Sequence, residues 1–252
     1  MADSLIISIV LFISALIHGL LGFAFALTAL PLIALVLSMK EAVPLMALYS
    51  LVVNIFMLLL LKEKKIFKIP LCFFLALFVG ILLGIRGFLV ASEFMLRFIL
   101  FLAILFFIIW EIYKMKRDNQ TNYKTEIEEE LFKHPYALGS AFIAGLLAGL
   151  LNTPGPPLII LLFHFKLNKN IFKATLQFIL AFSAFSAVLN HLMVGNITLP
   201  ILKLYFFNLP LVLIGLLLGQ RLYSHLSNRV YYYLVNLMLF ISGILLLLKS
   251  HH

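Results

Sequence analysis

The stretch that decides the fold is residues 136–165, which read YALGSAFIAGLLAGLLNTPGPPLIILLFHF. It is apolar almost throughout, yet three prolines and a glycine interrupt it at Asn152-Thr153-Pro154-Gly155-Pro156-Pro157. Proline lacks a backbone N–H and breaks a helix interior. In hydrocarbon an unpaired backbone group is costly, so such a break persists only where protein packs around it or where it lines a polar cavity. The stretch therefore predicts two short helices that meet at a site-lining break, and a bend at the membrane surface is the alternative.

The rest of the chain is equally apolar. Of its 252 residues, 64% are hydrophobic and 12% are charged, whereas a soluble domain has about 45–50% apolar and about 25% charged residues. Continuous apolar runs of about 20 residues indicate membrane helices rather than the strands of a barrel. The chain is therefore predicted to be an all-α, polytopic protein of the inner or plasma membrane, with about 8–10 membrane segments. Its other apolar runs are 5–37, 42–61, 69–91, 94–113, 171–194, 199–220 and 230–248.

Two halves of the sequence repeat one another. Ile17-His18-Gly19-Leu20-Leu21 aligns with Ile143-Ala144-Gly145-Leu146-Leu147 at an offset of 126, and Pro31-Leu32-Ile33 aligns with Pro157-Leu158-Ile159 at the same offset. Further on, Gly80, Gly84 and Arg86 align with Gly215, Gly219 and Arg221 at an offset of 135. An internal duplication is predicted, with a first membrane repeat at 1–113, a polar cytoplasmic linker at 114–135 and a second membrane repeat at 136–252.

The positive charges favour an inverted arrangement of the repeats. The run 5–37 would reach about 50 Å as one helix, against a hydrocarbon core of about 30 Å. If the first run of each repeat, 5–37 and 136–165, folds back to the side of the membrane from which it entered, 14 Lys and Arg residues lie on one side and 5 on the other. If both runs cross the membrane once, the two sides carry 11 and 8 Lys and Arg residues. The positive-inside rule prefers the first arrangement, which predicts inverted repeats, each opening with a broken or re-entrant helix, and termini on the non-cytoplasmic side.

The breaks are the predicted substrate site. In the second repeat a half-helix is expected to begin near Pro156-Pro157, and its free N–H groups and positive dipole end suit an anion. In the first repeat the break falls at Gly22-Phe23-Ala24, and Thr28 and Pro31 are expected to head the second half-helix. The candidate substrate-binding residues are His18, Gly19, Gly22, Thr28, Pro31, Asn152, Thr153, Pro154, Gly155 and Pro157.

Other polar groups within the spans leave two interpretations open. His18 is an ionisable group inside an apolar run, which favours a substrate or proton role, while a neutral histidine bonded to a carbonyl is the alternative. For Asn54, Gln177, Asn190 and His191, hydrogen bonds between helices are expected, with pore lining as the alternative. The Gly80/Gly84 and Gly215/Gly219 pairs predict close helix packing. Cys72, inside an apolar run, is expected to be a small buried hydrophobe.

The chain resembles the sulfite exporter TauE/SafE family over nearly its whole length. The resemblance rests on Gly145-Leu-Leu-Ala-Gly149 running into Gly155-Pro156-Pro157-Leu158, and on Gly19-Leu-Leu-Gly22 followed by Pro31-Leu32. It implies gradient-driven movement of small sulfur-containing or organic anions, such as sulfite, a sulfonate or sulfoacetate. It also implies that the site is lined by Gly19, Gly22, Thr28 and Pro31 together with Asn152, Thr153, Gly155 and Pro157.

The function predicted from the sequence is secondary transport of a small anion. The acidic residues of the apolar runs, Glu41, Glu93 and Glu111, lie near the ends of those runs, so none offers a buried cation ligand. An anion channel and a non-transporting membrane assembly factor are the alternatives. A membrane-embedded enzyme would need a clustered nucleophile, base or metal site, and the sequence predicts no catalytic residue, metal or cofactor. The net charge of +9 is assigned to lipid headgroups rather than nucleic acid. Proton or sodium coupling and a homodimer are left open.

Overall fold

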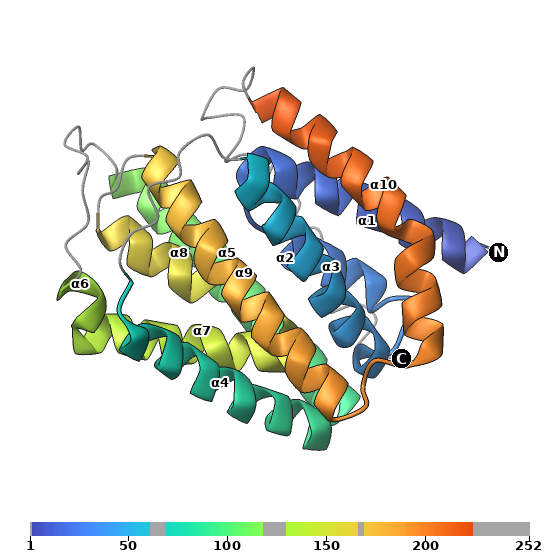
Figure 1. Ribbon diagram of the computed structural model, residues 1–252, viewed down its shortest axis with the longest axis horizontal. Helices are drawn as coiled ribbons and strands as arrows, with labels where there is room; N and C mark the ends of the chain where they lie inside the picture. The colour runs from blue at the N-terminus through green and yellow to red at the C-terminus, as the bar shows by residue number, and fades with distance from the viewer. Residues whose placement is uncertain (1, 61–68, 118–129, 166–168, 224–252) are drawn as a thin grey trace.

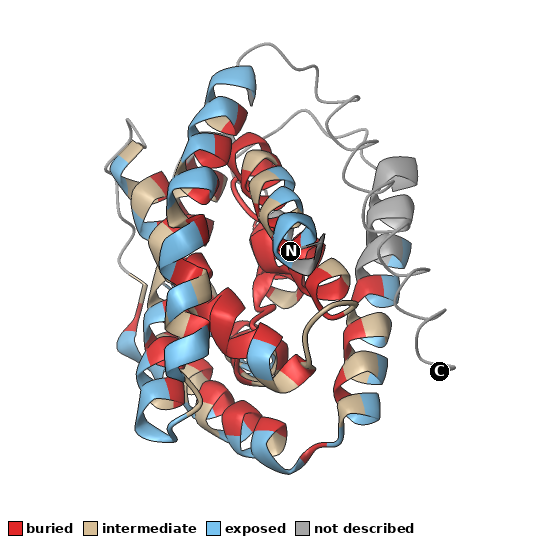
Figure 2. Ribbon diagram, turned by 90° about the vertical axis from the view of Figure 1, so that its right-hand side faces the viewer, coloured by how far each residue is buried: buried red, intermediate tan, exposed pale blue. Residues whose placement is uncertain are grey.

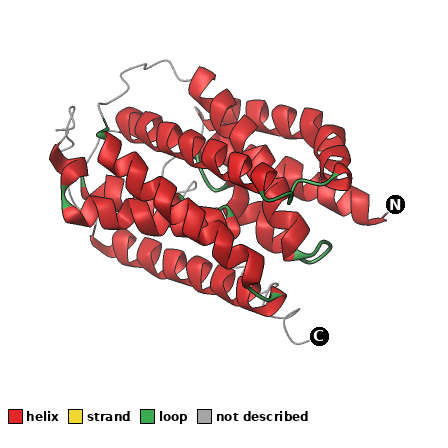
Figure 3. Cartoon of the chain, turned by 60° about the horizontal axis from the view of Figure 1, so that its bottom comes forward, coloured by secondary structure: helices red, strands yellow, loops and turns green. Residues whose placement is uncertain are grey.

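The computed structural model describes residues 2–60, 69–117, 130–165 and 169–223, and every regular element in these ranges is a helix (Figure 3). The predicted span 230–248 and most of the predicted linker lie outside the described residues. The helices are α1 Ala2–Leu21, α2 Phe25–Ile33, α3 Met39–Leu60, α4 Leu71–Val90, α5 Glu93–Arg117, α6 Glu130–Lys133, α7 Pro135–Leu151, α8 Gly155–His164, α9 Lys169–Met193 and α10 Leu199–Tyr223.

Five of the described helices are long and apolar enough to cross a membrane: Ser4–Leu21, Met39–Leu60, Leu71–Val90, Ile171–Met193 and Leu199–Leu222. Their outer faces carry large exposed hydrophobic side chains, among them Leu59, Val90 and Met193. In Figure 2 the buried residues face the interior of the bundle and the exposed ones face outward. An apolar outer surface of this kind suits lipid rather than water, so the chain is a multi-pass membrane protein. Cys72, expected to be buried, is exposed. It lies in the first turn of α4 beside Leu71, which is also exposed.

The described helices are organised by two close pairs, α1 with α10 and α4 with α7 (Figure 1). Each pair joins a helix of the first half of the chain to a helix of the second. The helices of each pair run parallel, since Phe12 and Leu16 of α1 meet Gly215 and Gly219 of α10 in that order. Helix α9 packs on α4 and on α3, which in turn contacts α10, so α9 lies between the two pairs.

Glycines allow the two helices of each pair to approach at backbone contact distance. In the α4–α7 pair a Cβ on Gly145 would overlap the backbone carbonyl of Leu77, and a Cβ on Gly80 would overlap that of Phe142. In the α1–α10 pair a Cβ on Gly219 would overlap the carbonyl of Leu16. Backbones in such contact gain dispersion energy that bulkier residues would forfeit. The predicted role of the Gly80/Gly84 and Gly215/Gly219 pairs in close packing is confirmed.

The start of α3 has nearly all of its backbone donors satisfied. Ser38 and Glu41 form a capping box, in which Ser38 Oγ accepts from the Glu41 N–H at 3.3 Å and Glu41 Oε2 accepts from the Ser38 N–H at 3.3 Å. The next two donors go to the first residue of α5, since Glu93 Oε2 accepts from the Met39 N–H at 3.0 Å and Glu93 Oε1 from the Lys40 N–H at 3.4 Å. In return, Lys40 Nζ donates to the carbonyls of Phe88 and Leu89 at the end of α4. The start of α3 is thereby fixed to the turn between α4 and α5.

Replacing Glu93 with alanine is expected to lower the free energy of unfolding by about 1 kcal/mol, the usual loss for a helix N-cap, and no more because the carboxylate is partly exposed. The measurement is the thermal unfolding midpoint of the detergent-solubilised protein. Glu130→Ala, on an exposed residue of α6, is the control. Equal midpoints for the two variants would contradict this role of Glu93.

One local prediction is corrected. Thr28 and Pro31 do not head the second half-helix, because α2 already begins at Phe25 and Pro31 lies inside it. At this position the proline lacks the N–H that would donate to the Leu27 carbonyl, so α2 has one helical hydrogen bond fewer. Helix α5 continues to Arg117, and α6 brings Phe132 into the core. Phe132 lies 5.2 Å from the ring centroids of both Phe73 and Phe165.

Candidate functional site

The first half of the site is the interruption between α1 and α2. Helix α1 ends with the Gly22 N–H donating to the His18 carbonyl at 2.6 Å. Gly22 and Ala24 then take left-handed conformations, with φ of 78° and 82°. This conformation costs about 1–2 kcal/mol for a non-glycine residue, and such strain concentrates at functional sites. The Phe25 N–H, the first of α2, donates to His18 Nδ1 at 3.3 Å, so the histidine side chain spans the break.

The second half is the interruption between α7 and α8. Asn152 terminates α7 in a left-handed conformation, φ 52°, a position where glycine or asparagine is usual. Its side-chain amide donates to Ser50 Oγ of α3 at 2.8 Å, which ties the break to α3. Helix α8 begins at Gly155, close to the predicted start at Pro156-Pro157. Prolines on both sides of Gly155 remove N–H groups that the first turn would otherwise present.

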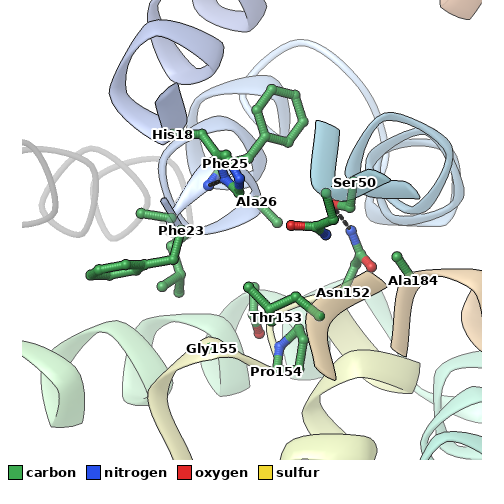
Figure 4. Close-up of a pocket in the computed structure, with 14 residues that line it drawn as sticks. His18, Phe23, Phe25, Ala26, Ser50, Asn152, Thr153, Pro154, Gly155 and Ala184 are labelled. Atoms are coloured by element: carbon green, nitrogen blue, oxygen red, sulfur yellow. Dashed lines mark hydrogen bonds between the residues drawn. The ribbon is translucent and has the colours of Figure 1, made fainter. Parts of the chain in front are cut away.

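A cavity lies between the two breaks (Figure 4). It is bounded by Ser50 and Asn54 midway along α3 and by Leu180 and Ala184 midway along α9. The volume is about 40 Å³, and one water needs about 10–15 Å³ measured in this way. It is therefore large enough for roughly three waters or one small ion. The lining comprises His18, Phe23, Ala24, Phe25, Ala26, Leu27, Ser50, Asn54, Asn152, Thr153, Pro154, Gly155, Leu180 and Ala184.

Two polar side chains of the lining have unused hydrogen-bonding capacity. Thr153 is 1% exposed and Asn54 is 4% exposed, and neither Thr153 Oγ1 nor Asn54 Oδ1 has a hydrogen-bond partner among the described residues. A buried polar group without a partner is destabilising. Ser50 Oγ accepts from Asn152, so its own O–H remains a donor. The cavity therefore presents two hydroxyls that can donate to a bound solute and one amide oxygen that can accept from it.

The lining carries little charge. No Asp, Glu, Lys or Arg is among the described residues that bound the cavity, and His18 is the one titratable group. Gln177 of α9 contacts two residues of the first break. Its Nε2 lies 3.3 Å from His18 Nε2 and donates to the carbonyl of Gly22. The first break is thus braced by α9, as the second is braced by α3.

The structure brings together half of the residues predicted from the sequence. His18, Asn152, Thr153, Pro154 and Gly155 line the cavity. The other five lie outside the lining. Gly19 packs against the backbone of α10, Gly22 packs against the side chain of Lys173, and the hydroxyl of Thr28 donates to the Ala24 and Phe25 carbonyls. Pro31 and Pro157 lie inside α2 and α8.

Several residues of the lining are not among the candidate site residues predicted from the sequence. Asn54 is a polar residue within a predicted span, for which pore lining is the alternative interpretation. Ser50, one helical turn earlier on the same face of α3, is the residue that such spacing could have indicated. Leu180, Ala184 and the apolar residues of the first break carry no signal in the sequence, since they look like any other membrane-helix residue.

Comparison with known proteins gives one match. The family model described as sulfite exporter TauE/SafE matches residues 6–246. No curated protein matches the chain, and no solved structure does.

Proposed function

Because the chain belongs to the sulfite exporter TauE/SafE family, a family of membrane transporters, we propose that it is a secondary transporter of a small anion and that the cavity between the two breaks binds this anion. The observation that carries the proposal is the meeting of two helix starts, α2 at Phe25 and α8 at Gly155, at a cavity lined by the unpartnered hydroxyl of Thr153. The aligned peptide dipoles give each helix start a partial positive charge, and this charge remains although the Phe25 N–H donates to His18 and prolines flank Gly155. Two such ends facing one cavity favour a negative solute.

The groups around the cavity suit an oxyanion. Each oxygen of such an ion accepts hydrogen bonds, and the hydroxyls of Thr153 and Ser50 can donate them. Hydrogen bonds to a charged acceptor are stronger than those between neutral groups. The absence of Asp and Glu from the described lining further favours an anion over a cation. In this proposal His18, Asn152, Thr153, Pro154 and Gly155 form the site, while Gly19, Gly22, Thr28, Pro31 and Pro157 shape the two breaks.

The size of the cavity narrows the substrate. A volume of about 40 Å³ accommodates an ion with the bulk of about three waters. Sulfite, with one sulfur and three oxygens, is of this size, whereas sulfoacetate is about twice as large. We therefore assign sulfite or an inorganic oxyanion of similar size as the preferred substrate.

The proposed architecture is a pair of inverted repeats. Equivalent contacts in the two halves support it: Gly19 of α1 packs on Gly219 of α10, and Gly145 of α7 packs on Gly80 of α4. These contacts relate Gly19 to Gly145 at the offset of 126 found in the sequence. They relate Gly80 to Gly219 at 139 rather than 135, a difference of about one helical turn. The sequence favours 135, because that register matches both glycines and also Arg86 with Arg221, whereas the register of 139 matches only Gly80 with Gly219.

Further contacts support a re-entrant first helix pair. Lys173, near the start of α9, packs on Gly22 at the end of α1. At the opposite end of α9, the ring centroid of His191 lies 5.4 Å from that of Phe88 at the end of α4, where Lys40 of α3 also binds. Between the end of α1 and the start of α3 the chain therefore returns along the length of α9, and α2 is the segment that returns. A site between two such returning helices, midway along α3 and α9, is characteristic of secondary transporters.

The test is uptake of labelled sulfite and sulfoacetate into proteoliposomes, with and without an imposed proton or sodium gradient. Saturable sulfite uptake above the level of protein-free liposomes is expected, with slower sulfoacetate uptake. Accelerated exchange when sulfite is preloaded inside would separate a carrier from a channel. If neither anion enters faster than into protein-free liposomes under any gradient, the proposed function is wrong.

A further inference from the structure

A polar strip on α9 continues from the cavity toward the start of that helix. Leu180 and Ala184 line the cavity. Gln177 and Lys173 lie three and seven residues before Leu180, and steps of three and four residues keep to one helix face. The face that closes one side of the cavity therefore carries an amide and then an ammonium group beyond it.

Gln177 lies between the cavity and Lys173. Its side chain is completely buried, and its Nε2 donates to the Gly22 carbonyl within the first break. Its Oε1 has no hydrogen-bond partner among the described residues. A buried amide oxygen without a partner is destabilising, so bracing the break does not use the full hydrogen-bonding capacity of this side chain. The amide can exchange the Gly22 carbonyl for an oxyanion as the acceptor of its N–H groups, since both are oxygen acceptors.

Lys173 lies behind the same break. It is 9% exposed, the only buried Lys or Arg among the side chains that the structure describes. Its stem covers Gly22 so closely that a Cβ there would lie 2.8 Å from Lys173 Cε. Its Nζ donates to Gln220 Oε1 of α10 at 3.0 Å. The ammonium is thereby held beside the break, in the first turns of α9, where the helix dipole disfavours a cation and a nearby anion would offset the cost.

We propose that Lys173 is a second anion-binding group, which receives the oxyanion on the side of the first break that faces the start of α9 and passes it to the Thr153 cavity by way of Gln177. The inference rests on the proposed function and adds a residue to it. It explains how a cavity lined by neutral donors attracts a charged substrate. A fixed positive charge on the route raises the local anion concentration, and the neutral site then holds the ion without trapping it.

The test compares sulfite uptake by wild-type protein with that by Lys173→Gln. Glutamine keeps most of the stem and can still donate to Gln220, so chiefly the charge is removed. We expect the KM for sulfite to rise about ten-fold, because the variant loses one favourable charge interaction in a partly buried environment. The maximal rate should stay close to that of the wild type. Lys173→Arg, which keeps the charge, is expected to retain most of the affinity. Lys203→Gln, at an exposed lysine of α10, is the matched control and should leave the KM unchanged.

The outcomes separate the two proposals. Absence of uptake by the wild type contradicts the proposed function itself. With an active wild type, a KM for Lys173→Gln equal to that of Lys203→Gln overturns the role of Lys173 alone. A purified variant that elutes as a single species shows that folding is preserved. Should Lys173→Gln fail this check, Lys173→Met, whose unbranched side chain keeps the packing on Gly22, repeats the measurement with the same two outcomes.

Discussion

Replacing Thr153 with valine is expected to reduce the affinity for sulfite roughly ten- to hundred-fold, because a hydrogen bond to a charged group contributes about 1.5–3 kcal/mol. Valine has nearly the same shape as threonine, so the cavity keeps its size. Thr153 Oγ1 has no hydrogen-bond partner among the described residues, so no internal bond of the described fold is lost. The unfolding midpoint should therefore stay the same or rise while transport falls. The measurements are the KM for sulfite uptake and thermal unfolding of the purified protein.

Thr175→Val is the matched control for this prediction. Thr175 is likewise buried with an unpartnered hydroxyl, but it does not line the cavity. The same change of chemistry should leave sulfite uptake unaltered there. If Thr153→Val takes up sulfite with the wild-type KM, or if the two variants lose affinity equally, the proposed site is in the wrong place.

Replacing Gly145 with alanine is expected to prevent correct assembly of the helix bundle. The added methyl group would overlap the Leu77 carbonyl oxygen and lie 3.0 Å from the backbone nitrogen of Ile81. These are backbone atoms and cannot rotate away as a side chain would, so α4 and α7 must separate. Overpacking of this kind costs about 1–3 kcal/mol and occasionally more. Separation would also disturb the neighbouring contacts of Gly80 and Gly149 in the same pair, so a loss above about 3 kcal/mol is expected.

The measurement is the yield of protein that elutes as a single species in mild detergent, together with its unfolding midpoint. Gly139→Ala provides the control, since Gly139 lies on the same helix and a Cβ there would have nothing within 4 Å. That variant should be equal to the wild type or more stable by up to about 1 kcal/mol, because alanine is the better helix former. Equal stability of Gly145→Ala and Gly139→Ala would contradict the packing assigned to the α4–α7 pair.

The candidate site could be predicted only in part. The proline-rich break gave Asn152, Thr153, Pro154 and Gly155 directly, because a proline cluster in an apolar run has few structural explanations. His18 was found because it is ionisable. Lys173 was missed as a site residue, since in the sequence it is one of several lysines near a loop and only its packing on Gly22 distinguishes it.

The glycines illustrate the same limit. Gly19 and Gly145 stand in similar motifs before the two breaks, and the family resemblance placed Gly19 in the site. In the structure each packs against the backbone of a helix from the other half of the chain. A glycine in an apolar helix permits close approach of either a ligand or a backbone, and the sequence cannot tell which neighbour comes close.

The sequence by itself determined the membrane environment, the helical class and the positions of both breaks. These follow from local chemistry, since apolar run length, proline and glycine act on the residues beside them. Only the tertiary structure decided which helices pair, in what register, and which groups meet around the cavity. Ser50 and Asn152, or Gly22 and Lys173, are more than 100 residues apart in the chain. Their contacts depend on the packing of several helices at once, a property that no local pattern encodes.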